Sequence, residues 1–265
     1  MHEAIDGVVI RIKDTGNNSR YLSVLTAEQG RISLLSKGSH SMKTGQMAIS
    51  QLYSYANYEY YIKGTAKILK GGAPIRVFYG IGADLDRLNL TAYLCDLIAE
   101  LTDEGEAAHD MLRLTLNMLH AVDKQLYPAE VIKGAVELRA VAMSGYAPEL
   151  DGCSLCGRDT DANLYFDVMN GALLCSSCLS RRGRQPVSAE HMDPAHFSDV
   201  LSPLTPAAVA AVRYCVMAPL SRLFAFELAD AEDMRLFCAA AETYALSHIG
   251  HGFATLDFYR AMQEQ

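Results

Sequence analysis

Four cysteines in two closely spaced pairs constrain this chain more than any other feature of its sequence. Cys153 pairs with Cys156 and Cys175 with Cys178, and two residues separate the members of each pair. A two-residue gap lets both thiolates bind one ion from a tight turn, and a connector of about 15–20 residues suits a returning hairpin. The spacing predicts a zinc ribbon in which these four cysteines hold one Zn²⁺.

The stretch between the two pairs has the pattern of a β-hairpin. Residues 164–168 and 172–174 are rich in apolar and aromatic side chains, and Asn170-Gly171 between them is a tight-turn sequence. Four thiolates complete the coordination sphere, whereas a catalytic zinc keeps one position open, so we expect a structural metal. It would stabilise a module that is too short to build its own apolar core.

Two disulfides or four unpaired thiols are the alternatives to a metal site. Residues 1–6 contain no basic stretch and no apolar signal core, so we expect a cytoplasmic protein whose thiols stay reduced. The other cysteines, Cys95, Cys215 and Cys238, stand singly among apolar residues, and we expect them to be buried and inert.

The charge of the chain is unevenly distributed. The 265 residues carry a net charge of −8. Residues 1–80 hold 10 Lys and Arg against 5 Asp and Glu, whereas residues 81–265 hold 13 against 26. Binding of a polyanion is therefore expected in the first part of the chain. No apolar run approaches the roughly 18 residues of a membrane span, so we expect no membrane insertion.

The first eighty residues alternate between apolar and polar side chains, as β-strands do. Turn residues divide them into five stretches, and five short strands in so few residues favour a small closed barrel, most commonly the oligonucleotide-binding (OB) fold. The expected strands are residues 4–12, 21–26, 31–36, 47–55 and 58–69.

Beyond residue 80 the apolar spacing becomes helical, with Thr205 and Pro206 at the start of one later helix. The sequence thus predicts an α+β multidomain protein. Its expected parts are an OB-fold domain at 1–80, a helical domain at 81–150 and 183–265, and the zinc ribbon at 151–182 inserted among the helices.

Basic residues of the expected barrel are candidates for contacts with nucleic-acid phosphates. A loop at 36–45 offers lysines, hydroxyls and glycines, and residues 53–61 hold 5 of the 14 tyrosines, whose rings stack on unpaired bases or lie half-buried in the barrel. A solvated loop is the alternative for 36–45. The candidate DNA-binding residues are Lys13, Arg20, Arg31, Lys37 and Lys43.

Signatures of common enzymes are missing from the sequence. The chain has no Gly-Lys-Ser/Thr phosphate loop, no His-Glu-x-x-His and no Gly-x-Ser-x-Gly, and Gly80 and Gly82 lack the third glycine of a dinucleotide loop. We therefore expect no catalytic residues and a protein that is not an enzyme.

Several local motifs, together with the order of the expected modules, resemble those of the bacterial recombination mediator family RecO. Residues 26–32 (TAEQGRI) and 36–38 (SKG) are similar to the N-terminal signature of that family. Residues 145–153 (GYAPELDGC) with Cys156-Gly157 are similar to its entry to the zinc module, and residues 171–175 (GALLC) to the return. The resemblance covers most of the chain.

The resemblance implies a non-enzymatic role in recombinational DNA repair. Proteins of this family bind single- and double-stranded DNA, anneal complementary strands and partner RecR. They also engage the acidic C-terminal tail of single-stranded-DNA-binding protein, so that RecA can load. An acidic tail needs positive charge beside an apolar surface. Basic residues on helices with apolar faces are Arg113, Lys124, Lys133 and Arg139, which we take as candidates for the tail site.

Two other classes of protein compete with this interpretation. A zinc-ribbon accessory factor of transcription or translation would use the barrel on RNA, and strand annealing distinguishes it from a recombination mediator. A metal-dependent hydrolase is disfavoured by the closed coordination sphere and the absent motifs.

Overall fold

The computed structural model describes residues 2–16, 19–37, 46–159, 164–181 and 201–263. The chain divides into two compact units, one formed by Met1–Gln125 with Thr255–Gln265 and the other by Leu126–Ala254. Within the described ranges, no helix is long and apolar enough to cross a membrane.

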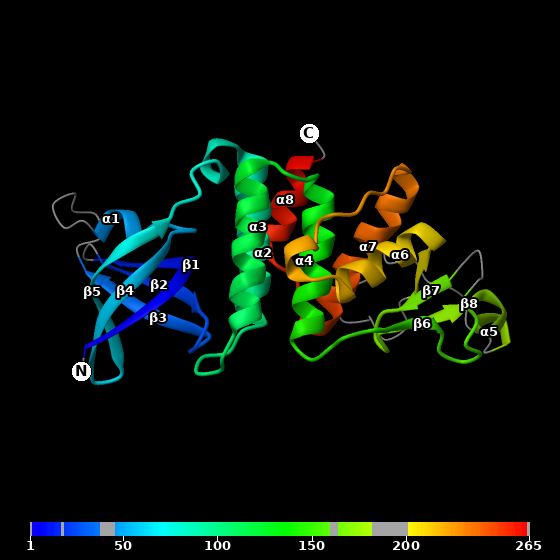
Figure 1. Cartoon of the computed structure of the whole chain (residues 1–265), viewed down its shortest axis with the longest axis horizontal. Coiled ribbons are helices and arrows are strands. Elements are labelled where there is room, and N and C mark those ends of the chain that lie inside the picture. The colour runs from blue at the N-terminus through cyan, green and yellow to red at the C-terminus, as the bar shows by residue number, and fades with distance from the viewer. Residues whose placement is uncertain (1, 17–18, 38–45, 160–163, 182–200, 264–265) are drawn as a thin grey trace. The chain divides into compact units, whose positions relative to one another are not determined.

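A closed five-stranded barrel forms the N-terminal part of the first unit (Figure 1). Its strands pair in the order β1-β2-β3-β5-β4, with β3 and β5 parallel and the other described pairs antiparallel. This confirms the predicted OB-type barrel. The strands are β1 (His2–Gly16), β2 (Ser19–Thr26), β3 (Arg31–Lys37), β4 (Tyr55–Lys63) and β5 (Ala66–Arg76).

The bounds of the last two strands differ from the prediction. Residues 58–69, expected to be one strand, form the end of β4, a turn at Gly64 with a φ of 63°, and the start of β5. Strand β5 then continues to Arg76, beyond residue 69 where the last strand was predicted to end. The prediction was wrong here because apolar side chains occur on both sides of Gly64, such as Tyr61 and Ile62 in β4 and Ile68 and Leu69 in β5.

The stretch at 47–55, expected to be a strand, begins with helix α1 (Gln46–Ile49). Ile49 is fully buried in the barrel core, and Tyr53, four residues further, is also buried. The backbone N–H of Tyr53, whose φ is 63°, donates to the carbonyl oxygen of Val9 at 2.8 Å. Packing against the barrel therefore outweighs the strand preference of this segment.

Helices of the first unit are attached to the barrel through a short loop. They are η2 (Ile81–Ala83), α2 (Leu85–Glu100), α3 (His109–Lys124) and α8 (Ala254–Gln263). In the loop between α2 and α3, Gly105 N–H donates to Gln29 O at 3.0 Å, and Ala108 N–H donates to Ala27 O at 2.7 Å. A Cβ on Gly30 would lie 2.1 Å from Asp103 O, so this close approach of two backbones requires glycine.

The second unit combines helices with a small sheet, whose strands follow the order β6-β8-β7-β9. Strands β7 and β8 form the hairpin predicted between the cysteine pairs, and β9, within the stretch 183–265 that was predicted to belong to the helical domain, pairs with β7. The described elements of the second unit are α4 (Ala129–Met143), β6 (Glu149–Cys153), β7 (Leu164–Asp167), β8 (Ala172–Cys175), α5 (Ser176–Arg181), β9 (Leu201–Leu204), α6 (Pro206–Met217), η5 (Leu220–Arg222) and α7 (Ala231–Ile249).

Local capping signals place two of these helices. Thr205 Oγ1 accepts a hydrogen bond from Ala208 N–H at 3.2 Å, and Pro206 occupies the first turn of α6, as predicted. Asp230 caps α7 in the same way, accepting from Glu232 N–H at 2.8 Å. Gly134 of α4 lies against the ring of Phe237 of α7, and a Cβ at this position would be only 2.4 Å from that ring. The absence of a side chain at Gly134 therefore lets the two helices pack closely.

Candidate functional site

The four paired cysteines converge at the end of the small sheet. Cys153 ends strand β6, Cys156 follows in the next turn, Cys175 ends β8, and Cys178 lies in helix α5. Their four Sγ atoms all lie within 4.8 Å of one another, and Cys156 Sγ is 3.7 Å from Cys175 Sγ. In a tetrahedral zinc site with Zn–S bonds of about 2.3 Å, the sulfurs lie about 3.8 Å apart. The arrangement therefore has the dimensions of a metal centre.

Backbone hydrogen bonds shape the turn that presents the first cysteine pair. The N–H of Gly157 donates to Cys153 O at 2.7 Å, and Gly157 itself has a φ of 71°. At the second pair, the N–H of Cys178 points to Cys175 Sγ at 3.4 Å. Such N–H groups stabilise thiolate charge and orient the sulfurs toward a common centre.

The thiols of the cluster differ in how easily they ionise. Burial opposes ionisation of Cys153, but backbone N–H groups at Cys175, Leu155 and Cys156 lower its pKa to about 6. Hydrogen bonding among the neighbouring thiols, first with Cys175 and then with Cys156, raises the pKa of Cys178 to about 12. One thiolate is thus favoured and further ones are costly without a cation, as expected of side chains that can hold a metal ion.

The candidate DNA-binding residues of the barrel fall into three groups. Lys13 and Lys37 are exposed, and no hydrogen bond or ion pair with another described residue engages either side chain. Arg20 pairs with Asp14 at 3.3 Å, and Arg31 donates from Nε to Thr102 O at 3.3 Å. Lys43 lies outside the described residues.

A tyrosine that sequence reasoning missed lies between the two exposed lysines. In the strand register, Tyr21 on β2 is opposite Lys13 on β1 and Leu35 on β3. Lys37 is two residues beyond Leu35 on β3, so its side chain lies on the same face of the sheet as those of Leu35 and Tyr21. Tyr21 is 40% exposed, while its neighbour Leu22 points into the core. The outer face of three adjacent strands therefore presents one aromatic ring flanked by two cations, a set of residues that only the strand pairing brings together.

The tyrosine-rich stretch at 53–61 has a mainly structural role. Tyr53, Tyr58 and Tyr60 are buried, and the hydroxyl of Tyr58 donates to Ile49 O and to Ser54 O, each at 3.0 Å. Of the two alternatives for these rings, packing inside the barrel therefore applies to Tyr58 and Tyr60, whereas Tyr53 is buried outside the barrel core. Tyr55 and Tyr61 are half-buried.

Comparison with known proteins agrees with this architecture. A family model described as "Recombination protein O N terminal" matches residues 1–78, and one described as "Recombination protein O C terminal" matches residues 82–257. The chain belongs to the RecO family. The barrel corresponds to the first RecO region, and the second region includes the cysteine cluster.

Relatives within the RecO family are distant in sequence but similar in length. The DNA repair protein RecO of Acetivibrio thermocellus is 26% identical over 258 residues, which cover 97% of this chain and 95% of the relative. That of Alkaliphilus metalliredigens is 28% identical over 173 residues, 65% of this chain and 70% of the relative. That of Clostridium acetobutylicum is 24% identical over 224 residues, 84% and 83% of the two chains.

The four basic residues taken as candidates for a RecO tail site lie in different environments. Arg113 and Lys124 are exposed on helix α3, and Lys124 pairs with Asp123 at 2.9 Å. Lys133 on α4 is buried and contacts Glu137 and Glu242, each at 2.7 Å. Arg139 donates from Nε to Cys215 O at 2.7 Å and also binds Ala218 O, at the C-terminal end of α6. A contact with an acidic tail at any of the four stays a prediction.

Proposed function

We propose that this protein is a recombinational DNA-repair mediator that binds single-stranded DNA on its barrel and anneals complementary strands. The observation that carries the proposal is the outer face of strands β1, β2 and β3, where Lys13, Tyr21 and Lys37 are neighbours. Membership of the RecO family supports the biological setting.

This face has the chemistry of a platform for single strands. An exposed tyrosine ring stacks on an unpaired base irrespective of its identity, and adjacent lysines neutralise phosphates. The described face displays no side chain set to read base edges, so binding is electrostatic and nearly independent of sequence. Both properties suit a protein that must act on any damaged strand and its complement.

The metal in this proposal is one Zn²⁺ per chain, held by Cys153, Cys156, Cys175 and Cys178. Four thiolate sulfurs at tetrahedral spacing suit zinc among the common metals, although iron binds the same donor set. Such a metal supplies folding free energy to the sheet of the second unit and leaves no position open for substrate.

The proposed partners are RecR and the acidic C-terminal tail of single-stranded-DNA-binding protein, whose engagement helps RecA to load. Arg113 and Lys124 are eleven residues apart, about three helical turns, and therefore share a face of α3 with half-buried Leu116 between them. This face offers the charge of Arg113 beside apolar surface, together with Lys124, whose partner Asp123 a tail carboxylate would replace. A labelled tail peptide should bind the wild type and lose affinity with Arg113→Glu/Lys124→Glu, and unchanged affinity would place the tail elsewhere.

Annealing of complementary labelled strands, naked and coated with single-stranded-DNA-binding protein, tests the main proposal. The wild type should accelerate annealing, and Lys13→Glu/Lys37→Glu should abolish most of that acceleration. Lys63→Glu/Lys70→Glu, on the β4–β5 hairpin, makes the same change in net charge and serves as the matched control. Equal loss in both double variants would show that net charge, and not this face, governs the activity.

A further inference from the structure

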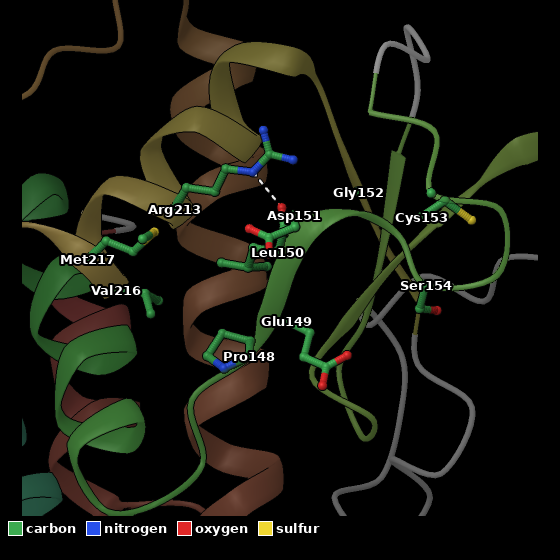
Figure 2. A pocket seen from close by; sticks show the side chains of 11 residues that line it. Pro148, Glu149, Leu150, Asp151, Gly152, Cys153, Ser154, Arg213, Val216 and Met217 are labelled. Carbon is green, nitrogen blue, oxygen red and sulfur yellow. Dashed lines mark hydrogen bonds between the residues drawn. The ribbon is translucent and has the colours of Figure 1, made fainter.

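A groove of about 590 Å³ lies between strand β6 and helix α6 in the second unit (Figure 2). Strand β6 is at the edge of its sheet, because its only described strand neighbour is β8. One side of the groove is formed by residues 148–154 and the other by Arg213, Val216 and Met217. None of the residues proposed to bind DNA or the acidic tail lines this groove.

One wall of the groove is an exposed apolar surface at the end of α6. Met217 is 76% exposed, and Val216 beside it is half-buried. Leu150 and Pro148 continue the apolar lining on the side of β6. A methionine left uncovered at such a position is adaptable in shape and suits apolar side chains of differing size.

The charged residues of the groove leave it acidic. Glu149 and Asp151 are both exposed, and the structure shows neither carboxylate in a hydrogen bond or ion pair with another described residue. Arg213, the one cation among the described lining residues, donates from Nε to Leu150 O at 2.6 Å and pairs through its terminal nitrogens with Asp159 (Figure 2 shows the first of these bonds). Its charge is therefore compensated, while those of Glu149 and Asp151 are not.

We propose that this groove binds a cationic segment of a partner protein, in which Lys or Arg residues flank an apolar side chain. The basic side chains would face Glu149 and Asp151, and the apolar one would cover Met217 and Val216. The same charge excludes DNA and the acidic tail, because like charges repel phosphates and carboxylates alike. The second unit would thus contribute a protein-binding surface of its own, made of residues that take no part in the proposed DNA contacts.

The experiment uses the full-length, zinc-loaded chain and a peptide of alternating Lys and Leu with glycine at both ends. Backbone amide spectra should show shifts that saturate at Asp151, Gly152, Ser154 and Val216. A peptide with Glu in place of Lys should cause none, and one with Ser in place of Leu should bind more weakly. Absence of shifts at these amides, or equal shifts with the Glu peptide or single-stranded DNA, would overturn the proposal.

Matched variants test whether Glu149 and Asp151 supply the charge that binds the peptide. Glu149→Gln/Asp151→Asn should weaken peptide binding roughly 3- to 10-fold, since exposed charge pairs contribute modestly. Glu130→Gln/Glu227→Gln changes the net charge equally at exposed positions outside the groove lining and should keep the wild-type affinity. Equal weakening by both pairs would reduce the effect to general charge attraction and contradict the proposal. Strand annealing by the groove variant should equal that of the wild type.

Discussion

The guanidinium of Arg11 donates a hydrogen bond from Nε to Oδ1 of Asp96 at 2.5 Å, joining strand β1 of the barrel to helix α2. Arg11 also reaches Glu100 Oε1 at 3.0 Å, and Asp96 accepts from Thr255 Oγ1 of α8 at 2.8 Å. The barrel and two helices of the first unit thus meet at one ion-pair cluster. Because two carboxylates compensate its charge, Arg11 adds little to the field that a DNA phosphate would experience.

Removal of this cation should destabilise the first unit. We expect Arg11→Met to lower the free energy of unfolding by about 1–3 kcal/mol, since a charged hydrogen bond is lost and Asp96 is left partly buried. Urea unfolding measures the change, and Lys13→Met should stay within about 0.5 kcal/mol of the wild type. Affinity for single-stranded DNA should show the opposite order, with Lys13→Met the weaker binder. Equal stability of the two variants would mean that the cluster contributes nothing to folding.

Tyr21 should distinguish single-stranded from double-stranded DNA. Its replacement in Tyr21→Ala removes a stacking surface worth about 1–3 kcal/mol per base, so affinity for single strands should fall by that amount. Duplex DNA offers no unpaired base and should bind almost as before. Tyr21→Phe keeps the ring and serves as the control in the same fluorescence anisotropy titrations. A similar loss on both kinds of DNA would indicate that Tyr21 supports the barrel and does not stack on bases.

The salt dependence of binding should report how many cations contact phosphates. If Lys13, Arg20, Arg31, Lys37 and Lys43 each neutralise one, the slope of log affinity against log salt on single strands should be about −3.5. Lys13→Gln/Lys37→Gln should reduce the steepness by about 1.4, the contribution of two phosphates. Titrations at four or more salt concentrations measure the slope. A slope that both substitutions leave unchanged would place the phosphate contacts elsewhere.

One zinc per chain is expected in protein purified without chelator. Cys175→Ser should lose that metal and lower the unfolding temperature of the second unit, because the sheet around the cluster depends on it. Binding to single-stranded DNA should persist, since the proposed contacts lie in the first unit. Cys238→Ser, at a cysteine outside the cluster, should keep the zinc. Elemental analysis and thermal unfolding decide between these outcomes, and a zinc-free wild type would refute the expectation.

Lys133 should prove to be a structural residue. Burial lowers its pKa, but Glu137 and Glu242 outweigh that effect and hold it above the usual 10.5. We expect Lys133→Met to cost about 3–5 kcal/mol, because two carboxylates lose their cation. The folded-state pKa is raised, so this stabilisation is complete below pH 10.5 and is lost as the pH rises through the folded value. Unfolding free energies of the variant and wild type should therefore converge above pH 10.5, and a constant difference would contradict this explanation.

Short-range patterns in the sequence were sufficient for much of the architecture. The cysteine spacing and the Asn170-Gly171 turn predicted the cluster and its hairpin, because both act within a few residues of the chain. The same holds for Thr205 at the start of α6. The alternation of the first eighty residues predicted a five-stranded barrel, although not where β4 ends and β5 begins. Apolar side chains occur on both sides of Gly64, so the alternation did not mark the turn between the two strands.

Contacts between residues far apart in the chain decided the rest. The linear sequence does not link Arg11 to Asp96, or Lys133, a candidate for the tail site, to Glu242, because these partners lie 85 and 109 residues away. Tyr21 stands out only when β1 and β3 bring Lys13 and Lys37 beside it. Whether a charge is free to bind a ligand depends on what packs against it, and a linear sequence does not specify that neighbour. The residue types of the site were therefore readable from the sequence, whereas their availability was decided by the tertiary structure.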